Sequence, residues 1–269
     1  MPAPRHKPRA LEFSDPAALE SALASQNRDI LVAAVSSPAL NEDLALAFLQ
    51  RRDVHQQVFE ALAKNGRVLK FRKVKVALVQ HPKTPRHVSL PMMRSMYTFE
   101  LMQIALTPIV AADVKIAIED VLVSRLATLS AGERLTLAKR SSARVAAALL
   151  LDEDKRIVEA GLNNPYLNES LVVKALVHPR PTELLATYVC RHSKWSHRKD
   201  VQLAALRNPF TPFASAIRFA ESLSTELLRD LFRQSALPDK IKAYLLDMAE
   251  KREEKRRRPV SDKQETLDE

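Results

Sequence analysis

The chain of 269 residues has only three glycines, one cysteine and one tryptophan, and aromatic residues make up 5% of it. So few glycines, and no sustained alternation of β-branched residues, leave little material for strands, which predicts an all-α fold. The single cysteine, Cys190, excludes an internal disulfide and is typical of a reducing compartment. The longest apolar run, residues 145–151, is far shorter than the roughly 18 residues of a membrane span. We therefore expect a cytoplasmic protein that does not enter a membrane.

The sequence also lacks the motifs of nucleotide and metal chemistry. Neither GxGxxG nor GxxxxGKS/T occurs, so we expect no nucleotide cofactor and no other cofactor. The pattern Cys190-x-His192-x4-His197 offers three potential metal ligands, but none forms a pair with zinc-like spacing, and we expect no metal. Cys190 could act as a nucleophile, although the sequence places no base beside it. His81 and His178, each before a proline, are interpreted as turn residues with a backbone hydrogen bond.

What the sequence does contain is a corner phrase that occurs four times, in which a helical stretch ends at a polar residue plus proline and a helix-start signal follows. Its prolines are Pro38, Pro82, Pro165 and Pro209, spaced by 44, 83 and 44 residues. The spacing predicts a repeat of about 42 residues with a degenerate copy in the middle, and self-similarity of this length is typical of helical solenoids. The expected fold is a right-handed α-solenoid of stacked short helix pairs.

Each corner phrase has a physical reason to separate two helices. Proline cannot continue a helix, and it disfavours the helical conformation of the residue before it. A short oxygen-bearing side chain can then accept from the free amides of the next first turn. The expected N-caps are Asn41, Thr84, Asn168 and Thr211. Pro85 and Pro212 are expected at the first helical position, where a missing N–H costs nothing.

The expected domain organisation is simple. Residues 1–12 form a flexible basic arm, and residues 13–250 form a single α-solenoid domain of about sixteen helices of roughly 8 to 15 residues. The first of these helices opens with Asp15 as cap and Pro16 at its first position. Residues 251–269 comprise a charged helix end, which a proline at 259 stops, and a disordered acidic tail.

Charge is unevenly distributed along this basic chain, whose formal net charge is +10. No carboxylate lies between Glu60 and Glu100, although this segment contains nine lysines and arginines. Its cations are Lys64, Arg67, Lys70, Arg72, Lys73, Lys75, Lys83, Arg86 and Arg94. Unneutralised positive charge attracts polyanions, so this segment could form a binding surface. Alternatively, the cations form an outer face of the solenoid that contacts only water. We predict nucleic-acid contacts for Lys64, Arg67, Lys70, Arg72, Lys73, Lys75 and Arg86.

Helical spacing within this segment separates the charges from the core. Val68, Phe71, Val74 and Leu78 recur at intervals of three and four, which predicts one buried stripe. The basic side chains around this stripe are therefore expected to project from other faces.

A second basic stretch, residues 188–199, combines cations with the only tryptophan. Its expected nucleic-acid contacts are Arg191, Lys194, Trp195, Arg198 and Lys199. The cations would hold phosphates while Trp195 stacks on a base or sugar. In the alternative interpretation, Trp195 packs under a helix corner with its indole N–H bonded to a carbonyl.

The run of residues 149–165, LLLDEDKRIVEAGLNNP, with the Asn-Pro-x-Thr-Pro corner at residues 208–212, resembles HEAT-like repeats and the leucine-rich repeat variant. The resemblance covers about residues 28–235, and it implies a HEAT-like or ARM-like superhelix that presents a concave surface to a partner. HEAT-like alkylpurine DNA glycosylases are similar in length and basicity. That resemblance implies aromatic residues beside a carboxylate, for which the candidates are Trp195 and Asp200.

The leading hypothesis is a non-catalytic scaffold whose basic surface binds a polyanion, nucleic acid or nucleoprotein. Two alternatives remain open: a regulatory scaffold that contacts an acidic protein surface, and a DNA glycosylase. The sequence does not determine the oligomeric state or whether the two basic stretches share a face.

Overall fold

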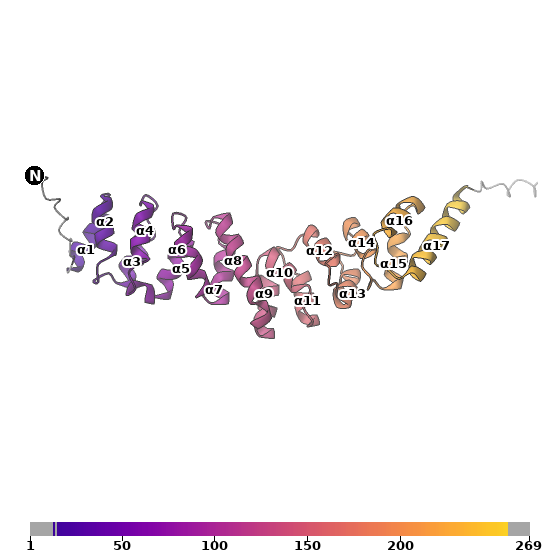
Figure 1. Cartoon of the computed structure of the whole chain (residues 1–269), viewed down its shortest axis with the longest axis horizontal. Helices are drawn as coiled ribbons and strands as arrows, with labels where there is room; N and C mark the ends of the chain where they lie inside the picture. The colour runs from indigo at the N-terminus through magenta and orange to yellow at the C-terminus, as the bar shows by residue number, and fades with distance from the viewer. Residues whose placement is uncertain (1–12, 14, 258–269) are drawn as a thin grey trace, which may run out of the picture. The chain divides into compact units, whose positions relative to one another are not determined.

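The computed structural model describes residue 13 and residues 15–257, and within them every regular element is a helix (Figure 1). The predicted all-α class is confirmed. These residues form seventeen α-helices of 7 to 19 residues and two short 3-10 helices, close to the expected number. The expected arm at residues 1–12 and the acidic tail at residues 260–269 lie outside the described part. No helix in that part is long and apolar enough to cross a membrane.

The chain divides into two compact units, the first ending at Arg125 and the second beginning at Leu126. The first contains α1 (Pro16–Ala24), α2 (Arg28–Val35), α3 (Glu42–Phe48), α4 (Gln56–Leu62), η1 (Val68–Lys70), α5 (Arg72–Gln80), α6 (Arg86–Arg94), α7 (Thr98–Leu106) and α8 (Ala112–Arg125). The second contains η2 (Leu126–Thr128), α9 (Ala131–Arg140), α10 (Ala143–Leu149), α11 (Lys155–Leu162), α12 (Glu169–Leu176), α13 (Glu183–Arg191), α14 (Lys199–Ala205), α15 (Phe213–Ala220), α16 (Thr225–Phe232) and α17 (Asp239–Arg257).

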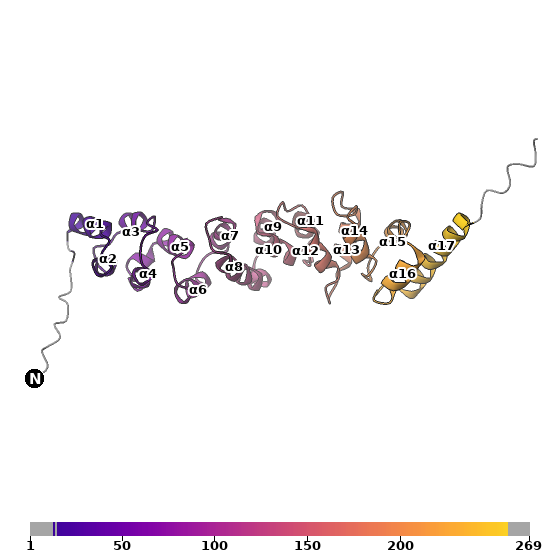
Figure 2. The same ribbon diagram turned by 90° about the horizontal axis from the view of Figure 1, so that it is seen from above.

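Helices of the first unit lie in two rows, with α1, α3, α5 and α7 in one row and α2, α4, α6 and α8 in the other (Figure 2). Contacts follow the chain order, because α1 packs on α2 and α3, α3 on α5, and α5 on α6 and α7. The second unit shows the same packing pattern, in which α9 contacts α10 and α11, α10 contacts α12, and α12 contacts α14. Each helix therefore buries a few aliphatic side chains against its near neighbours in the chain.

Eight helices of the second unit repeat the spacing of the first. Helix α1 begins at Pro16 and α10 at Ala143, which is an offset of 127 in sequence number. Each following pair of helix starts, up to α8 at Ala112 and α17 at Asp239, keeps this same offset. The two units are thus built on one plan, and the repeated phrases of the sequence follow from it.

The interpretation of the phrases as marks of a 42-residue repeat of helix pairs is wrong. Pro38 and Pro82 precede α3 and α6, and Pro165 and Pro209 precede α12 and α15. The interval between two such prolines therefore spans three helices rather than two. Prolines also precede α8, α13 and α17, at Pro108, Pro181 and Pro238. By contrast, α4, α11 and α16 begin at a capping side chain without a proline.

Two of the four predicted N-caps inside the phrases are confirmed. Asn41 and Asn168 accept hydrogen bonds from the amides of Leu44 and Leu171, at 2.9 and 3.0 Å. Asp15 likewise caps α1, with Pro16 at the first position.

The other two caps are wrong. Thr84 and Thr211 donate their hydroxyls back to the carbonyls of Leu78 and Ala205, both at 2.6 Å. Pro85 and Pro212 then stand at the N-cap itself, one position earlier than expected.

The residue before each proline ties its corner to an earlier part of the unit. Asn164 donates its Nδ2 to the carbonyls of Ala138 and Ser141, at 2.9 and 3.1 Å, and its Oδ1 accepts from the Tyr166 amide. Asn208 donates its Nδ2 to one carbonyl, that of Leu176, and its Oδ1 accepts from the Phe210 amide. The turn interpretation of His81 and His178 is confirmed, because Nδ1 of each accepts from the backbone amide two residues later.

In each unit, one arginine near the end of the last helix donates hydrogen bonds to the carbonyls at the end of an earlier helix. Arg125 donates to the carbonyls of Met93, Arg94 and Met96, where α6 ends. Arg252, at the equivalent position of the second unit, donates to the carbonyls of Ala220, Glu221 and Leu223, where α15 ends. Carbonyls at a helix end lack intrahelical donors, so each guanidinium satisfies several of them together. The predicted charged helix end is helical over residues 251–257 as part of α17.

Candidate nucleic-acid interface

The first basic corner, residues 63–71, connects α4 to α5. Asn65 holds it, because its Nδ2 donates to the carbonyls of Val35 and Ser37 at 2.9 and 3.1 Å. Its Oδ1 accepts from the amide of Arg67 at 3.2 Å. Val68 is fully buried at the start of η1. The side-chain amide of Asn65, bonded to the end of α2, and the buried side chain of Val68 thus hold the corner in place.

Three cations project from this fixed backbone. Lys64, Arg67 and Lys70 are exposed, and they line an open depression of about 530 Å³. The remaining lining residues are Ser36, Pro38, Ala61, Asn65 and Gly66, so no carboxylate faces the depression. Such a site favours an anion, since three positive charges converge with no acidic group to neutralise them.

Further along the segment, other helices supply carboxylates that the local sequence lacks. Arg72 pairs with Glu100 of α7 through two contacts of 2.6 and 2.9 Å, and the Arg72 guanidinium holds the pKa of Glu100 below its ordinary value. Arg86 pairs with Asp113 of α8. Arg72 and Arg86, two of the predicted nucleic-acid contacts, are therefore each paired with a carboxylate from another helix.

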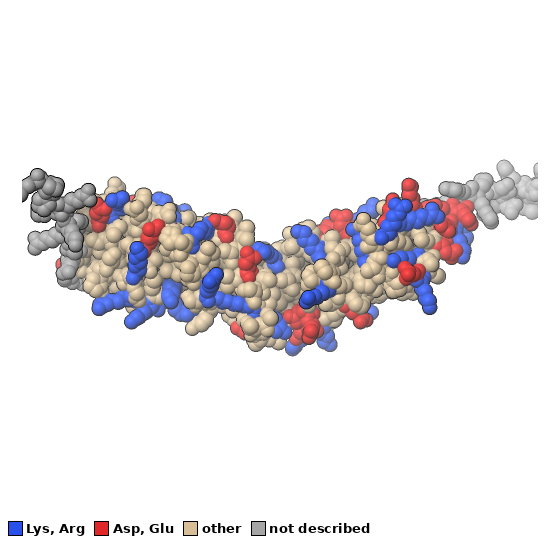
Figure 3. Space-filling view, viewed as in Figure 1, with Lys and Arg blue, Asp and Glu red and all other residues tan. Residues whose placement is uncertain are grey.

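The other seven cations of the segment form no ion pair with a described residue. They are Lys64, Arg67, Lys70, Lys73, Lys75, Lys83 and Arg94. In Figure 3, Lys and Arg side chains follow the lower edge of the first unit, where Asp and Glu side chains are few. Positive charge at this unit is therefore mostly left to solvent or to a partner.

Two exposed aromatic side chains accompany these cations. Phe71, predicted as part of the buried stripe, is 40% exposed, because the chain is extended there and α5 starts only at Arg72. Tyr97 is 63% exposed, and the Arg72 guanidinium carbon lies 3.4 Å from its ring centroid. Sequence reasoning missed both residues, since the contact of Tyr97 with the basic segment depends on packing of α7 beside α5.

The second basic corner, residues 190–198, connects α13 to α14. Trp195 is only 1% exposed, and its Nε1 donates to the carbonyl of Leu162 at 2.8 Å. The role of Trp195 in stacking on a base is therefore corrected, and the packing alternative is confirmed. His192 accepts from the Lys194 amide through Nδ1, and burial keeps the pKa of His192 below its ordinary value.

Cations surround this second corner as well. Arg191, Lys194, Arg198 and Lys199 are all exposed, and none forms an ion pair with a described residue. The Lys194 ammonium lies 4.1 Å from the Trp195 ring centroid, so Lys194 covers the buried ring.

The catalytic alternatives lose their reactive groups. A glycosylase site with Trp195 beside Asp200 has no aromatic face to offer, because Trp195 is in the core. Burial raises the pKa of the Cys190 thiol to about 11, which leaves it protonated at neutral pH. Cys190, His192 and His197 do not assemble a ligand set, since no group of three potential ligands occurs among the described residues.

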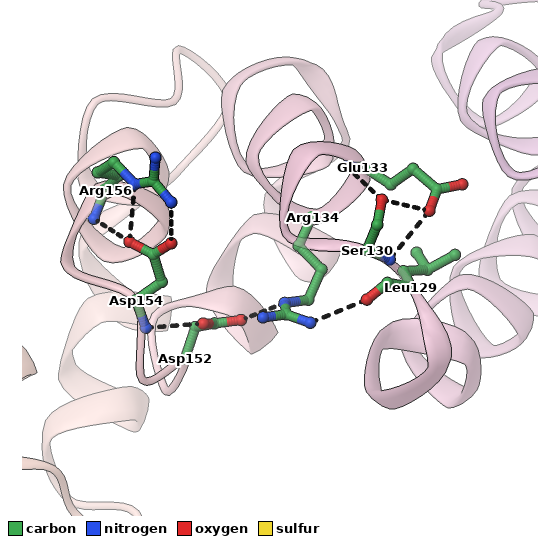
Figure 4. Close-up of polar contacts among 7 residues, drawn as sticks. All are labelled: Leu129, Ser130, Glu133, Arg134, Asp152, Asp154 and Arg156. Atoms are coloured by element: carbon green, nitrogen blue, oxygen red, sulfur yellow. Dashed lines mark hydrogen bonds and ion pairs between the residues drawn. The ribbon is translucent and has the colours of Figure 1, made fainter.

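Two carboxylates of the acidic run, Asp152 and Asp154, hold helix starts in place, as Figure 4 shows. Asp152 pairs with Arg134 at 2.8 Å, and Arg134 also donates to the Leu129 carbonyl. Asp154 caps α11 and pairs with Arg156. The Arg156 guanidinium, with a smaller effect of the Arg156 backbone amide, lowers the pKa of Asp154 to about 2. These carboxylates are occupied by helix starts and arginines.

No protein-family model, curated protein or solved structure matches the chain.

Proposed function

We propose that the chain is a non-catalytic scaffold that binds nucleic acid through its basic corners, with each unit forming a short HEAT-like α-solenoid. The solenoid proposal is supported by the main contacts within each unit, which join helices one or two places apart along the chain. Stacked repeats that contact only their neighbours are the defining property of such folds.

The single observation that carries the binding proposal is the depression lined by Lys64, Arg67 and Lys70 without any carboxylate. Neighbouring Lys73 and Lys75 extend the unpaired charge along α5. The exposed rings of Phe71 and Tyr97 favour nucleic acid over an acidic protein surface, because bases stack on aromatic side chains beside phosphate-binding cations.

The proposal is tested by fluorescence polarisation with a labelled single-stranded oligonucleotide. If one corner neutralises three phosphates, the slope of log affinity against log salt is about −2, so binding weakens about 20-fold between 50 and 200 mM salt. The variant Lys64→Glu, Arg67→Glu, Arg191→Glu, Lys194→Glu is expected to lose at least tenfold in affinity.

A control variant makes the same change in net charge elsewhere. It carries Glu at four exposed basic positions away from both corners: Arg52, Lys174, Arg180 and Arg207. We expect it to retain affinity within about threefold. Absence of binding by the parent at low salt, or equal losses in the two variants, would overturn the proposal.

A further inference from the structure

The two basic corners occupy the same place in the two units. The offset of 127 in sequence number that relates the helices puts Lys64 and Arg67 of the first corner at Arg191 and Lys194 of the second. Arg72, the first residue of α5, corresponds to Lys199, the first residue of α14. A lysine or arginine is thus repeated at three matching positions, and at two of them, Lys64/Arg191 and Arg67/Lys194, neither residue pairs with a described carboxylate.

Charge elsewhere in the basic segment is not repeated. At the same offset, the counterparts of Lys73, Lys75, Lys83, Arg86 and Arg94 are Asp200, Gln202, Phe210, Phe213 and Glu221. Lys70 corresponds to His197. The corner therefore keeps two of its three cations in both units, whereas the helices that follow it keep only the cation at the first position of α5 and α14.

The backbone of the corner is also held in the same way by different atoms. Asn65 accepts from the amide of Arg67, and the corresponding His192 accepts from the amide of Lys194. In the first unit the Asn65 amide donates to the Val35 carbonyl. In the second, that donor is the Trp195 indole, and its acceptor, Leu162, is the counterpart of Val35 at the same offset.

We propose that the chain carries two equivalent binding sites for the phosphates of nucleic acid, one at the corner of residues 63–71 and one at the corner of residues 190–198. The proposal rests on the proposed function and adds its stoichiometry. The buried Trp195 is then part of the support of the second site, and the exposed Lys194 above it is a phosphate contact.

Isothermal titration calorimetry of the full chain with a single-stranded hexanucleotide at low salt tests the proposal. We expect two hexanucleotides per parent chain. The pair Lys64→Glu and Arg67→Glu should leave one, and the pair Arg191→Glu and Lys194→Glu should also leave one. The same pairs changed to Gln, with helical content checked by circular dichroism, exclude misfolding as the cause.

Each outcome is decisive. One hexanucleotide per parent chain, lost through only one of the two pairs, would overturn the two-site inference and leave the proposed function standing. Absence of binding by the parent would contradict both. A control pair, Lys174→Glu with Arg180→Glu, should keep two sites, and the loss of a site in that control would overturn the assignment to the corners.

Discussion

His81 has the same place in the first unit that Asn208 has in the second, but its side chain titrates. Its Nε2–H donates to the Arg51 carbonyl at 3.0 Å, and its Nδ1 accepts from the Lys83 amide at 3.2 Å. The ring also stacks on Phe59, with centroids 4.2 Å apart. The bond accepted by Nδ1 requires the neutral imidazole, and burial, with a smaller effect of nearby cations, lowers the pKa of His81.

This lowered pKa predicts a pH dependence of stability. The folded state binds fewer protons at His81 than the unfolded state, so the free energy of unfolding falls as pH drops below the ordinary histidine value of about 6.5. The loss levels off below the folded-state pKa. In His81→Asn, an amide replaces the imidazole as it does at Asn208, and denaturant titrations at pH 7 and pH 5 should show a smaller fall than in the parent. An equal fall would contradict the assignment.

At the scale of the helix corner, the sequence predicts an N-cap correctly where a single local hydrogen bond determines which residue caps the helix. Asn41 and Asn168 cap their helices as predicted, because their partners lie three residues away. Thr84 and Thr211 have a competing acceptor in the preceding helix, and a hydroxyl can donate where a cap must accept. The sequence pattern does not decide between these two bonds.

The corner arginines give a stability prediction for whole elements. Arg125→Met keeps much of the side-chain volume but removes the donors to the carbonyls of Met93, Arg94 and Met96. We expect it to lower the free energy of unfolding by about 2 kcal/mol, as for hydrogen bonds to a charged group. Urea denaturation measures this. Arg94→Met, at an exposed position, is the matched control and should change stability by less than about 0.5 kcal/mol. Equal effects would contradict the role of Arg125.

At the scale of the whole molecule, the sequence predicted the helical class and the two basic stretches but not their equivalence. The all-α class follows from composition, which acts everywhere along the chain. The partners of Arg72 and Trp195 are Glu100 and Leu162, 28 and 33 residues away, so only the packing of helices brings them together. The common plan of the two units lies in the positions of their helix starts, since the matching corners share charge and geometry but no identical residue.

Hydrogen–deuterium exchange of the full chain, with and without a saturating single-stranded oligonucleotide at low salt, measures directly whether nucleic acid binds at both corners. We expect slower exchange in peptides that cover residues 63–71 and residues 190–198, with little change in α12 and α16. Protection confined to other segments, or at neither corner despite saturation, would contradict it.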